Sequence, residues 1–127
     1  MRFPGKKVFV TGASRGIGHA IARAFQEEGA YVIGTHTGAN KETTDVCQEW
    51  VVSDFSDIQC IKNCAEYVRD AEPDILINNA GVNKIAPFVD IDPNDFLFIQ
   101  QVNVFAPFML CQAVVPGMKK KKLGTNY

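Results

Sequence analysis

The stretch that decides the fold of this 127-residue chain is Thr11-Gly12-Ala13-Ser14-Arg15-Gly16-Ile17-Gly18. It follows a β-branched and aromatic run at residues 7–11, which predicts a buried strand, and it leads into a helical pattern. Glycines in such a turn let the backbone approach a phosphate, and the helix that begins near Gly16 presents unpaired N–H groups to an anion. No Gly-Lys-Ser/Thr follows, so this is not the phosphate loop of ATPases. Taken alone, the glycines predict either a phosphate-binding turn or an ordinary tight turn.

Strands and helices alternate along the next sixty residues. Apolar residues at three- and four-residue spacing predict a helix from Gly16 to Gly29, where the glycine ends it. The further predicted elements are a strand at 31–35, a polar loop at 37–44, a strand at 49–52, a helix capped by Ser56 and ending before Pro73, and a strand at 74–78. This alternation predicts an α/β fold, a doubly wound parallel sheet in one domain spanning residues 1–127.

The last third of the chain, residues 94–122, predicts one long helix with a kink or break near Pro107 and near Pro116. Its apolar residues fall on two sides at helical spacing. One side is Phe98, Val102, Phe105 and Met109, and the other is Phe96, Ile99, Pro107, Leu110 and Val114. One side can pack on the sheet, and the other needs a second layer or a second subunit.

Charge and hydropathy exclude several classes of function. Thirteen Lys and Arg against 14 Asp and Glu give a net charge of -1, so nothing favours nucleic acid or an anionic membrane surface. The basic run Lys119–Lys122 is typical of a solvated helix end. Polar residues such as Asn103 and Gln112 interrupt the apolar stretches, and the N-terminus lacks a leader pattern, so we expect no membrane span and a cytoplasmic location.

The four cysteines are expected to be structural thiols rather than metal ligands. They form no Cys-x-x-Cys pair and have no histidine at ligand spacing. They are Cys47, Cys60, Cys64 and Cys111. We expect no metal site.

Four motifs in register resemble the short-chain dehydrogenase/reductase family, most closely its bacterial β-ketoacyl-ACP reductases. The glycine loop has the family's TGxxxGxG spacing, Asp54 follows the third strand, Asn78-Asn79-Ala80-Gly81 follows the fourth, and Asn103 lies in the long helix. The resemblance implies a Rossmann-type fold in which Asp54, with Phe55 beside it, lies at the adenine ring, and in which the Asn-Asn-Ala-Gly motif closes the cofactor cleft. It also implies that Asn103 is catalytic, holding a water in a proton relay and interrupting its own helix locally.

The cofactor is expected to be NADP(H) rather than NAD(H). NAD-binding proteins of this type place a carboxylate at the end of the second strand, and here that end is Gly34-Thr35-His36-Thr37. Arg15 can offer its guanidinium to a 2′-phosphate, with Thr35, Thr37 and Lys41 nearby; the alternative is a simple surface arginine. The expected cofactor-binding residues are Gly12, Ser14, Arg15, Gly16, Ile17, Gly18, Thr35, Thr37, Asp54, Phe55, Asn79, Ala80 and Gly81.

Most of the family's catalytic set has no match in this sequence. The family's tyrosine and lysine come as Tyr-x-x-x-Lys, which does not occur here, and the three serines, Ser14, Ser53 and Ser56, lie in the cofactor half. Family members run to about twice this length. We therefore expect a fold truncated after the fourth strand and the following long helix, with residues 75–77 left as a bare apolar edge that promotes homo-oligomers or aggregation. The resemblance places the family's dimer interface on the same long helix.

Three functions stay open at this point. The first is an NADP-dependent oxidoreductase acting on a small carbonyl compound or an acyl thioester, seen here without its serine and Tyr-x-x-x-Lys. The second is a non-catalytic NADP-binding module or an inactive truncated remnant. The third, a flavodoxin-like domain that responds to FMN or to phosphate, leaves the Asn-Asn-Ala-Gly motif and Asn103 unexplained.

Overall fold

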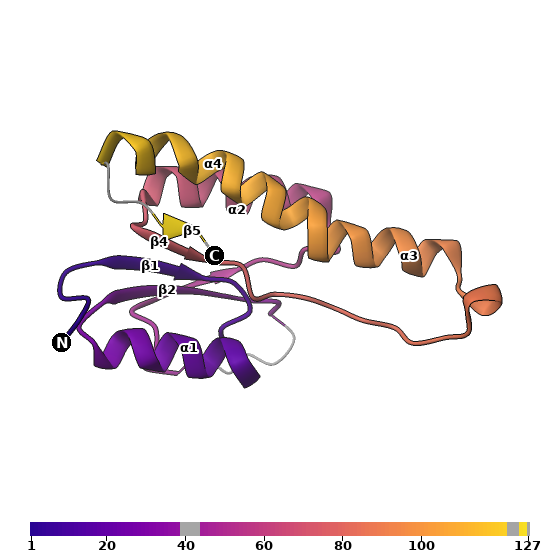
Figure 1. Ribbon diagram of the computed structural model, residues 1–127, viewed down its shortest axis with the longest axis horizontal. Helices are drawn as coiled ribbons and strands as arrows, with labels where there is room; N and C mark the ends of the chain where they lie inside the picture. The colour runs from indigo at the N-terminus through magenta and orange to yellow at the C-terminus, as the bar shows by residue number, and fades with distance from the viewer. Residues whose placement is uncertain (39–43, 122–124, 127) are drawn as a thin grey trace.

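Five parallel strands form one sheet in the order β3-β2-β1-β4-β5 (Figure 1). The computed structural model describes residues 1–38, 44–121 and 125–126. The strands are β1 Lys7–Val10, β2 Tyr31–His36, β3 Glu49–Val52, β4 Ile75–Ile77 and β5 Thr125–Asn126. Helix α1 (Gly16–Glu27) covers one face, and α2 (Ile58–Ala71) and α4 (Ala106–Lys121) cover the other. The predicted doubly wound α/β fold is confirmed.

Alternate residues of the strands face two separate apolar layers. In β1, Val8 and Val10 pack with Ala22 of α1, whereas Phe9 packs with Ile61 of α2 and Leu110 of α4. All of these side chains are fully buried. Because strand side chains alternate in direction and both faces are covered, a one-residue slip of β1 would exchange the contents of the two layers.

The residue that caps α2 lies one position later than predicted. The cap is Asp57, whose carboxylate accepts the Gln59 N–H at 2.8 Å, and not Ser56. The prediction of Ser56 was wrong because that residue is held by the preceding turn, where Asp54 Oδ1 accepts from the Ser56 N–H at 3.0 Å and from its hydroxyl at 2.7 Å. Both are carboxylates at turn positions where a short acceptor side chain reaches a backbone N–H two residues on.

The long helix is interrupted by a π-helical turn. Helix α3 (Pro93–Gln100) passes into η2 (Gln101–Phe105) and then into α4. Pro107 follows η2 closely, and a widened turn relieves the clash of its ring with the preceding turn. A kink or a break was predicted near Pro116, and no break occurs there, since α4 continues through this residue to Lys121. Lys122, the predicted end, lies outside the described residues.

Strand β5 covers the sheet edge that the sequence predicted to be bare. It pairs in parallel with β4, with Thr125 opposite Ile75 and Asn126 opposite Leu76. The expectation that the sheet stops after its fourth strand was therefore wrong. The error arose because the resemblance placed a new strand only beyond residue 127, whereas two residues after α4 already suffice to form the first rungs of a parallel ladder.

One helical stretch of the described residues, Pro93–Lys121, is long and apolar enough to cross a membrane, by length and composition alone. The sequence had predicted no such stretch. In this structure 22% of its most apolar window is buried. The core helix of a soluble protein passes the same test, and the buried side chains of this stretch pack on the sheet and α2.

An arm leaves the sheet after β4 and returns at α3 (Figure 1). It contains the 3-10 turn η1 (Phe88–Asp90). Ile85, Phe88 and Val89 are 93%, 90% and 86% exposed, so this arm is the most exposed apolar segment described.

Candidate nucleotide-binding site

The glycine loop joins the carboxyl end of β1 to the first turn of α1. Gly12 and Gly16 have φ values of 65° and 61°, in the left-handed region that favours glycine. A Cβ on Gly18 would lie 2.0 Å from the Gly12 carbonyl oxygen and 2.4 Å from Asn79 Nδ2. The start of α1 is thus pressed against the end of β1, and only glycine fits at the contact.

The first turn of α1 is open to an anion. Its cap is Arg15 in extended conformation, no described side chain caps it, and the turn carries no acidic residue. The side chains of Arg15 and Ile17 are exposed, and that of Ser14 is half-buried. Free N–H groups at the positive end of a helix dipole attract phosphate. This is the geometry that the glycine spacing predicted.

Thr35 holds the glycine loop through two hydrogen bonds. Its hydroxyl accepts the Gly12 N–H at 2.9 Å, and its carbonyl accepts the Ala13 N–H at 2.9 Å. The residue is only 2% exposed, so its side chain shapes the loop and does not itself reach a 2′-phosphate. Thr37 follows β2 directly and is exposed, and Lys41 lies outside the described residues.

The loop is tied to the Asn-Asn-Ala-Gly motif at residues 78–81. Thr11 Oγ1 accepts the N–H groups of Asn79 at 3.0 Å and Ala80 at 2.9 Å. Asn79 Nδ2 in turn donates to the Gly12 carbonyl at 3.1 Å. Sequence reasoning missed Thr11, although its place directly before the first glycine of the motif was a usable signal.

Asn103 holds the chain just beyond that motif. Its Oδ1 accepts the Val82 N–H at 2.9 Å, and its Nδ2 donates to the Val82 carbonyl at 2.8 Å. Gly81 lies beside it, since a Cβ there would be 3.3 Å from Asn103 Oδ1. Asn103 lies within η2, so the expected local interruption of its helix is confirmed.

The turn after β3 carries the two residues that the resemblance places at the adenine ring. Asp54 is exposed, with Oδ1 engaged by Ser56. The Phe55 side chain is 5% exposed and packs in the core, which leaves only its backbone for a nucleotide. Sequence reasoning also missed Gln101, whose Nε2 donates to the carbonyls of Phe55 and Ser56 at 2.9 and 2.7 Å.

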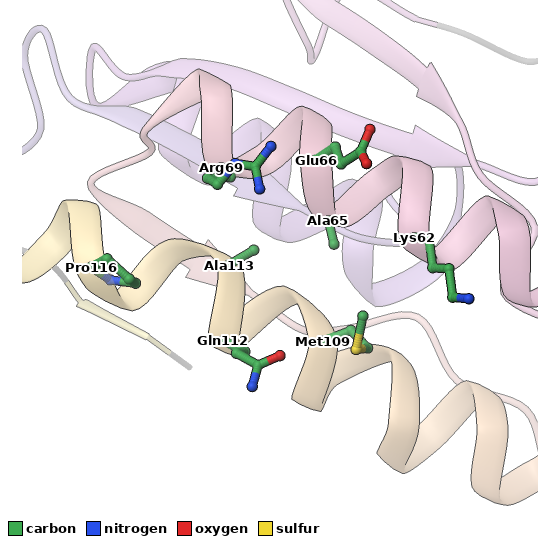
Figure 2. Close-up of a pocket in the computed structure, with 8 residues that line it drawn as sticks. All are labelled: Lys62, Ala65, Glu66, Arg69, Met109, Gln112, Ala113 and Pro116. Carbon is green, nitrogen blue, oxygen red and sulfur yellow. The ribbon is translucent and has the colours of Figure 1, made fainter.

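A hollow of about 390 Å³ lies between α2 and α4 and contains none of the predicted site residues (Figure 2). Its lining is Lys62, Ala65, Glu66, Arg69, Met109, Gln112, Ala113 and Pro116.

Among the described residues no three His, Cys, Asp or Glu side chains gather as metal ligands. The cysteines are free thiols, and burial raises the pKa of Cys47 to about 12 and that of Cys64 to about 11. The glycine loop is therefore the candidate site.

A sequence profile of the short chain dehydrogenases matches residues 6–125. The chain belongs to this family. Among curated relatives of this short-chain dehydrogenase, the 3-oxoacyl-[acyl-carrier-protein] reductase FabG of Salmonella typhimurium is 37% identical, over 98% of this chain and 54% of the relative. The Escherichia coli (strain K12) reductase of the same name is 35% identical over the same shares. The chain thus spans about half the length of the curated relatives it matches.

Solved structures of other short-chain dehydrogenases superimpose closely on this one. A metagenomic short-chain oxidoreductase in complex with NADP is 33% identical with a TM-score of 0.89, covering 99% of this chain and 61% of its own. A 3-oxoacyl (acyl-carrier-protein) reductase from Agrobacterium tumefaciens C58 with NADP bound is 29% identical with a TM-score of 0.89, covering 98% and 52%. These structures support a nicotinamide cofactor.

Proposed function

We propose that this short-chain dehydrogenase binds NADP(H) at the glycine loop, as the nucleotide-binding part of an oxidoreductase that moves hydride between nicotinamide and a carbonyl or alcohol carbon. The observation that carries the proposal is the uncapped first turn of α1, held against β1 by a contact that only glycine allows. The residues present fit the group, because the space that a Cβ at Gly18 would fill is what lets loop and helix meet at the phosphates.

The contacts of the nucleotide can be assigned to residues. The backbone of residues 12–18 would hold the pyrophosphate, Asp54 would meet the adenine, and residues 79–81 would border the nicotinamide ribose. When bound, the cofactor supplies the hydride. Arg15 and Thr37 would hold the 2′-phosphate, because Arg15 is exposed at the loop and β2 ends without a carboxylate that would repel it. Asn103 would order a water beside the reacting carbon.

The substrate is proposed to be a small carbonyl compound, of which an acyl thioester is the favoured class. Support comes from the relatives of highest identity quoted above, which are named as 3-oxoacyl-[acyl-carrier-protein] reductases. We further propose a cytoplasmic location and a homo-oligomeric assembly.

A second candidate function is a non-catalytic NADP-binding module. These 127 residues contain no Tyr-x-x-x-Lys. Turnover separates the two functions: a chain that oxidises NADPH with an acetoacetyl thioester is an enzyme, whereas one that binds NADPH and never oxidises it is the module.

The test of nucleotide binding is a titration with NADPH and with NADH, followed by nicotinamide fluorescence. We expect saturable binding with NADPH preferred. Arg15→Ala should weaken NADPH binding about tenfold and leave NADH unchanged, because one charge-assisted contact is lost. Arg23→Ala, an exposed arginine farther along α1, is the matched control and should change neither. An Arg15→Ala protein that still prefers NADPH to the same degree would refute the assignment of Arg15.

A further inference from the structure

Gln101 joins two parts of the molecule that the proposed function uses separately. It is the first residue of η2, the turn that carries Asn103, and its side-chain amide donates to the carbonyls of Phe55 and Ser56. These carbonyls belong to the turn after β3, which also carries Asp54. The hydrogen bonds, at 2.9 and 2.7 Å, span 46 and 45 residues of sequence.

Hydrogen bonds continue from both ends of this link. On one side, Ser56 donates its N–H and hydroxyl to Asp54. On the other side, η2 presents Asn103, which grips both backbone groups of Val82. The segment before Val82 is tied through Asn79 to the Gly12 carbonyl of the glycine loop. Gln101 thus completes a series of hydrogen bonds and short backbone segments that runs from Asp54 to the glycine loop.

The chemistry of the amide suits this place. A glutamine NH₂ has two donors, one for each of two successive carbonyls, whereas a carboxylate would only accept and would be repelled by both. Val102, the next residue, is 5% exposed and shares a core cluster with Phe55. The turn after β3 is therefore held in two ways. Phe55 packs in the same core cluster as Val102, and the Gln101 amide donates to the carbonyls of Phe55 and Ser56.

We propose that Gln101 is a positioning residue, which holds the adenine-side turn (residues 53–57) against η2. Both the affinity for nucleotide and the two hydrogen bonds of Asn103 to Val82 then depend on the Gln101 amide. The proposal rests on the proposed NADP(H) binding. Its test therefore includes a measurement that needs no nucleotide.

The variants are Gln101→Met, which keeps the length and removes the donors, and Gln101→Lys, which restores donors to the two carbonyls. Gln100→Met, at the exposed last residue of α3, is the matched control. The affinities for NADPH and for 2′,5′-ADP are measured, together with amide hydrogen exchange at Val82 in the free protein. Gln101→Met should weaken both ligands about tenfold and speed Val82 exchange by a similar factor. Gln101→Lys should return both quantities to within about twofold of the wild type, and Gln100→Met should change neither.

Each outcome decides the proposal. Unchanged affinity and unchanged Val82 exchange in Gln101→Met overturn it, as does a fall in thermal stability that Gln101→Lys reverses without restoring affinity. If the wild-type chain binds neither NADPH nor 2′,5′-ADP, the proposed function fails. The rate of amide exchange at Val82 then tests by itself whether Gln101 positions η2. Faster exchange that Gln101→Lys restores supports the link to Asn103, and exchange like that of the wild type refutes it.

Discussion

A single side-chain carbon decides whether the glycine loop can close against the Asn-Asn-Ala-Gly motif. Gly18→Ala would place a Cβ 2.0 Å from the Gly12 carbonyl oxygen and 2.4 Å from Asn79 Nδ2. The closer of these two atoms belongs to the backbone, which cannot yield as the end of a flexible side chain can. We expect loss of NADPH binding and a destabilisation of about 1–3 kcal/mol from overpacking. Urea unfolding and the fluorescence titration measure the two effects.

Gly117→Ala is the control for that substitution. Gly117 lies inside α4, and the nearest atom to an added Cβ is Glu72 Cγ at 3.7 Å, an ordinary contact. Alanine there should stabilise the chain by about 0.5–1 kcal/mol, since glycine is a poor helix former. If Gly18→Ala retained NADPH binding at wild-type strength, the packing of α1 on β1 would not be what forms the site.

At the residue scale, sequence spacing predicted the glycines and the asparagines but not the groups that support them. Gly12, Gly16 and Gly18 are constrained by their own backbone and neighbours, so a local motif records them. Thr11 and Gln101 act on partners 68 and 46 residues away, and their types carry no local signature. Such partners become visible only when the fold brings distant segments together.

At the scale of elements, a carboxylate shared by two tyrosines ties β3 to β2 and α2. The Tyr31 hydroxyl donates to Glu49 Oε2 at 2.6 Å, and the Tyr67 hydroxyl donates to Oε1. These hydrogen bonds, that of Tyr31 first, lower the pKa of Glu49 below its ordinary value of 4.5. Desolvation and then the bond to Glu49 raise the pKa of Tyr67 to about 12.

The lowered pKa of Glu49 predicts an acid-sensitive contribution to stability. Because the folded-state pKa lies below the unfolded one, the contribution is complete above pH 4.5 and is lost as the pH falls through the lowered value. The free energy of unfolding falls between pH 5 and pH 3, and in Glu49→Gln this decrease should be smaller by up to about 1 kcal/mol, as expected for a solvent-screened group. Urea unfolding at several pH values measures it, with Glu27→Gln, an exposed glutamate ending α1, as control. Equal acid sensitivity of the wild type and Glu49→Gln would contradict the prediction.

The elements themselves were largely predictable, because strand and helix periodicity are local properties. The errors occurred where tertiary contacts override local pattern. Asp57 caps α2 while Asp54 holds Ser56 in the preceding turn, and β5 forms only because α4 returns the chain beside β4. The division of the long helix into two apolar sides was only partly right, for a related reason. A π turn adds one residue to the helix, so residues before and after η2 that were predicted on the same side lie on different sides. Phe105 is 37% exposed, whereas Val102, predicted on its side, is buried.

At the scale of the whole molecule, only one of the two apolar surfaces predicted from the sequence is exposed: the long helix, and not the edge of β4. The expected bare edge at β4 is covered by β5, and Leu76 is fully buried. The exposed apolar side chains instead lie on the arm and along the long helix, where Leu97, Val104 and Phe108 are 64%, 56% and 56% exposed. Exposed apolar side chains gathered on one helical stretch are typical of an interface between subunits.

We therefore expect self-association through the helix face rather than through a sheet edge. Sedimentation velocity over a range of concentrations should find dimers or larger species, and Phe108→Glu should shift them toward monomer with the free energy of unfolding nearly unchanged, because Phe108 is already more than half exposed. Val52→Glu is the matched control, since Val52 ends the outer strand β3 and is 65% exposed. If Val52→Glu dissociates the assembly and Phe108→Glu does not, the sheet edge is the interface. A wild-type chain that sediments as a single monomer at every concentration would contradict both forms of association.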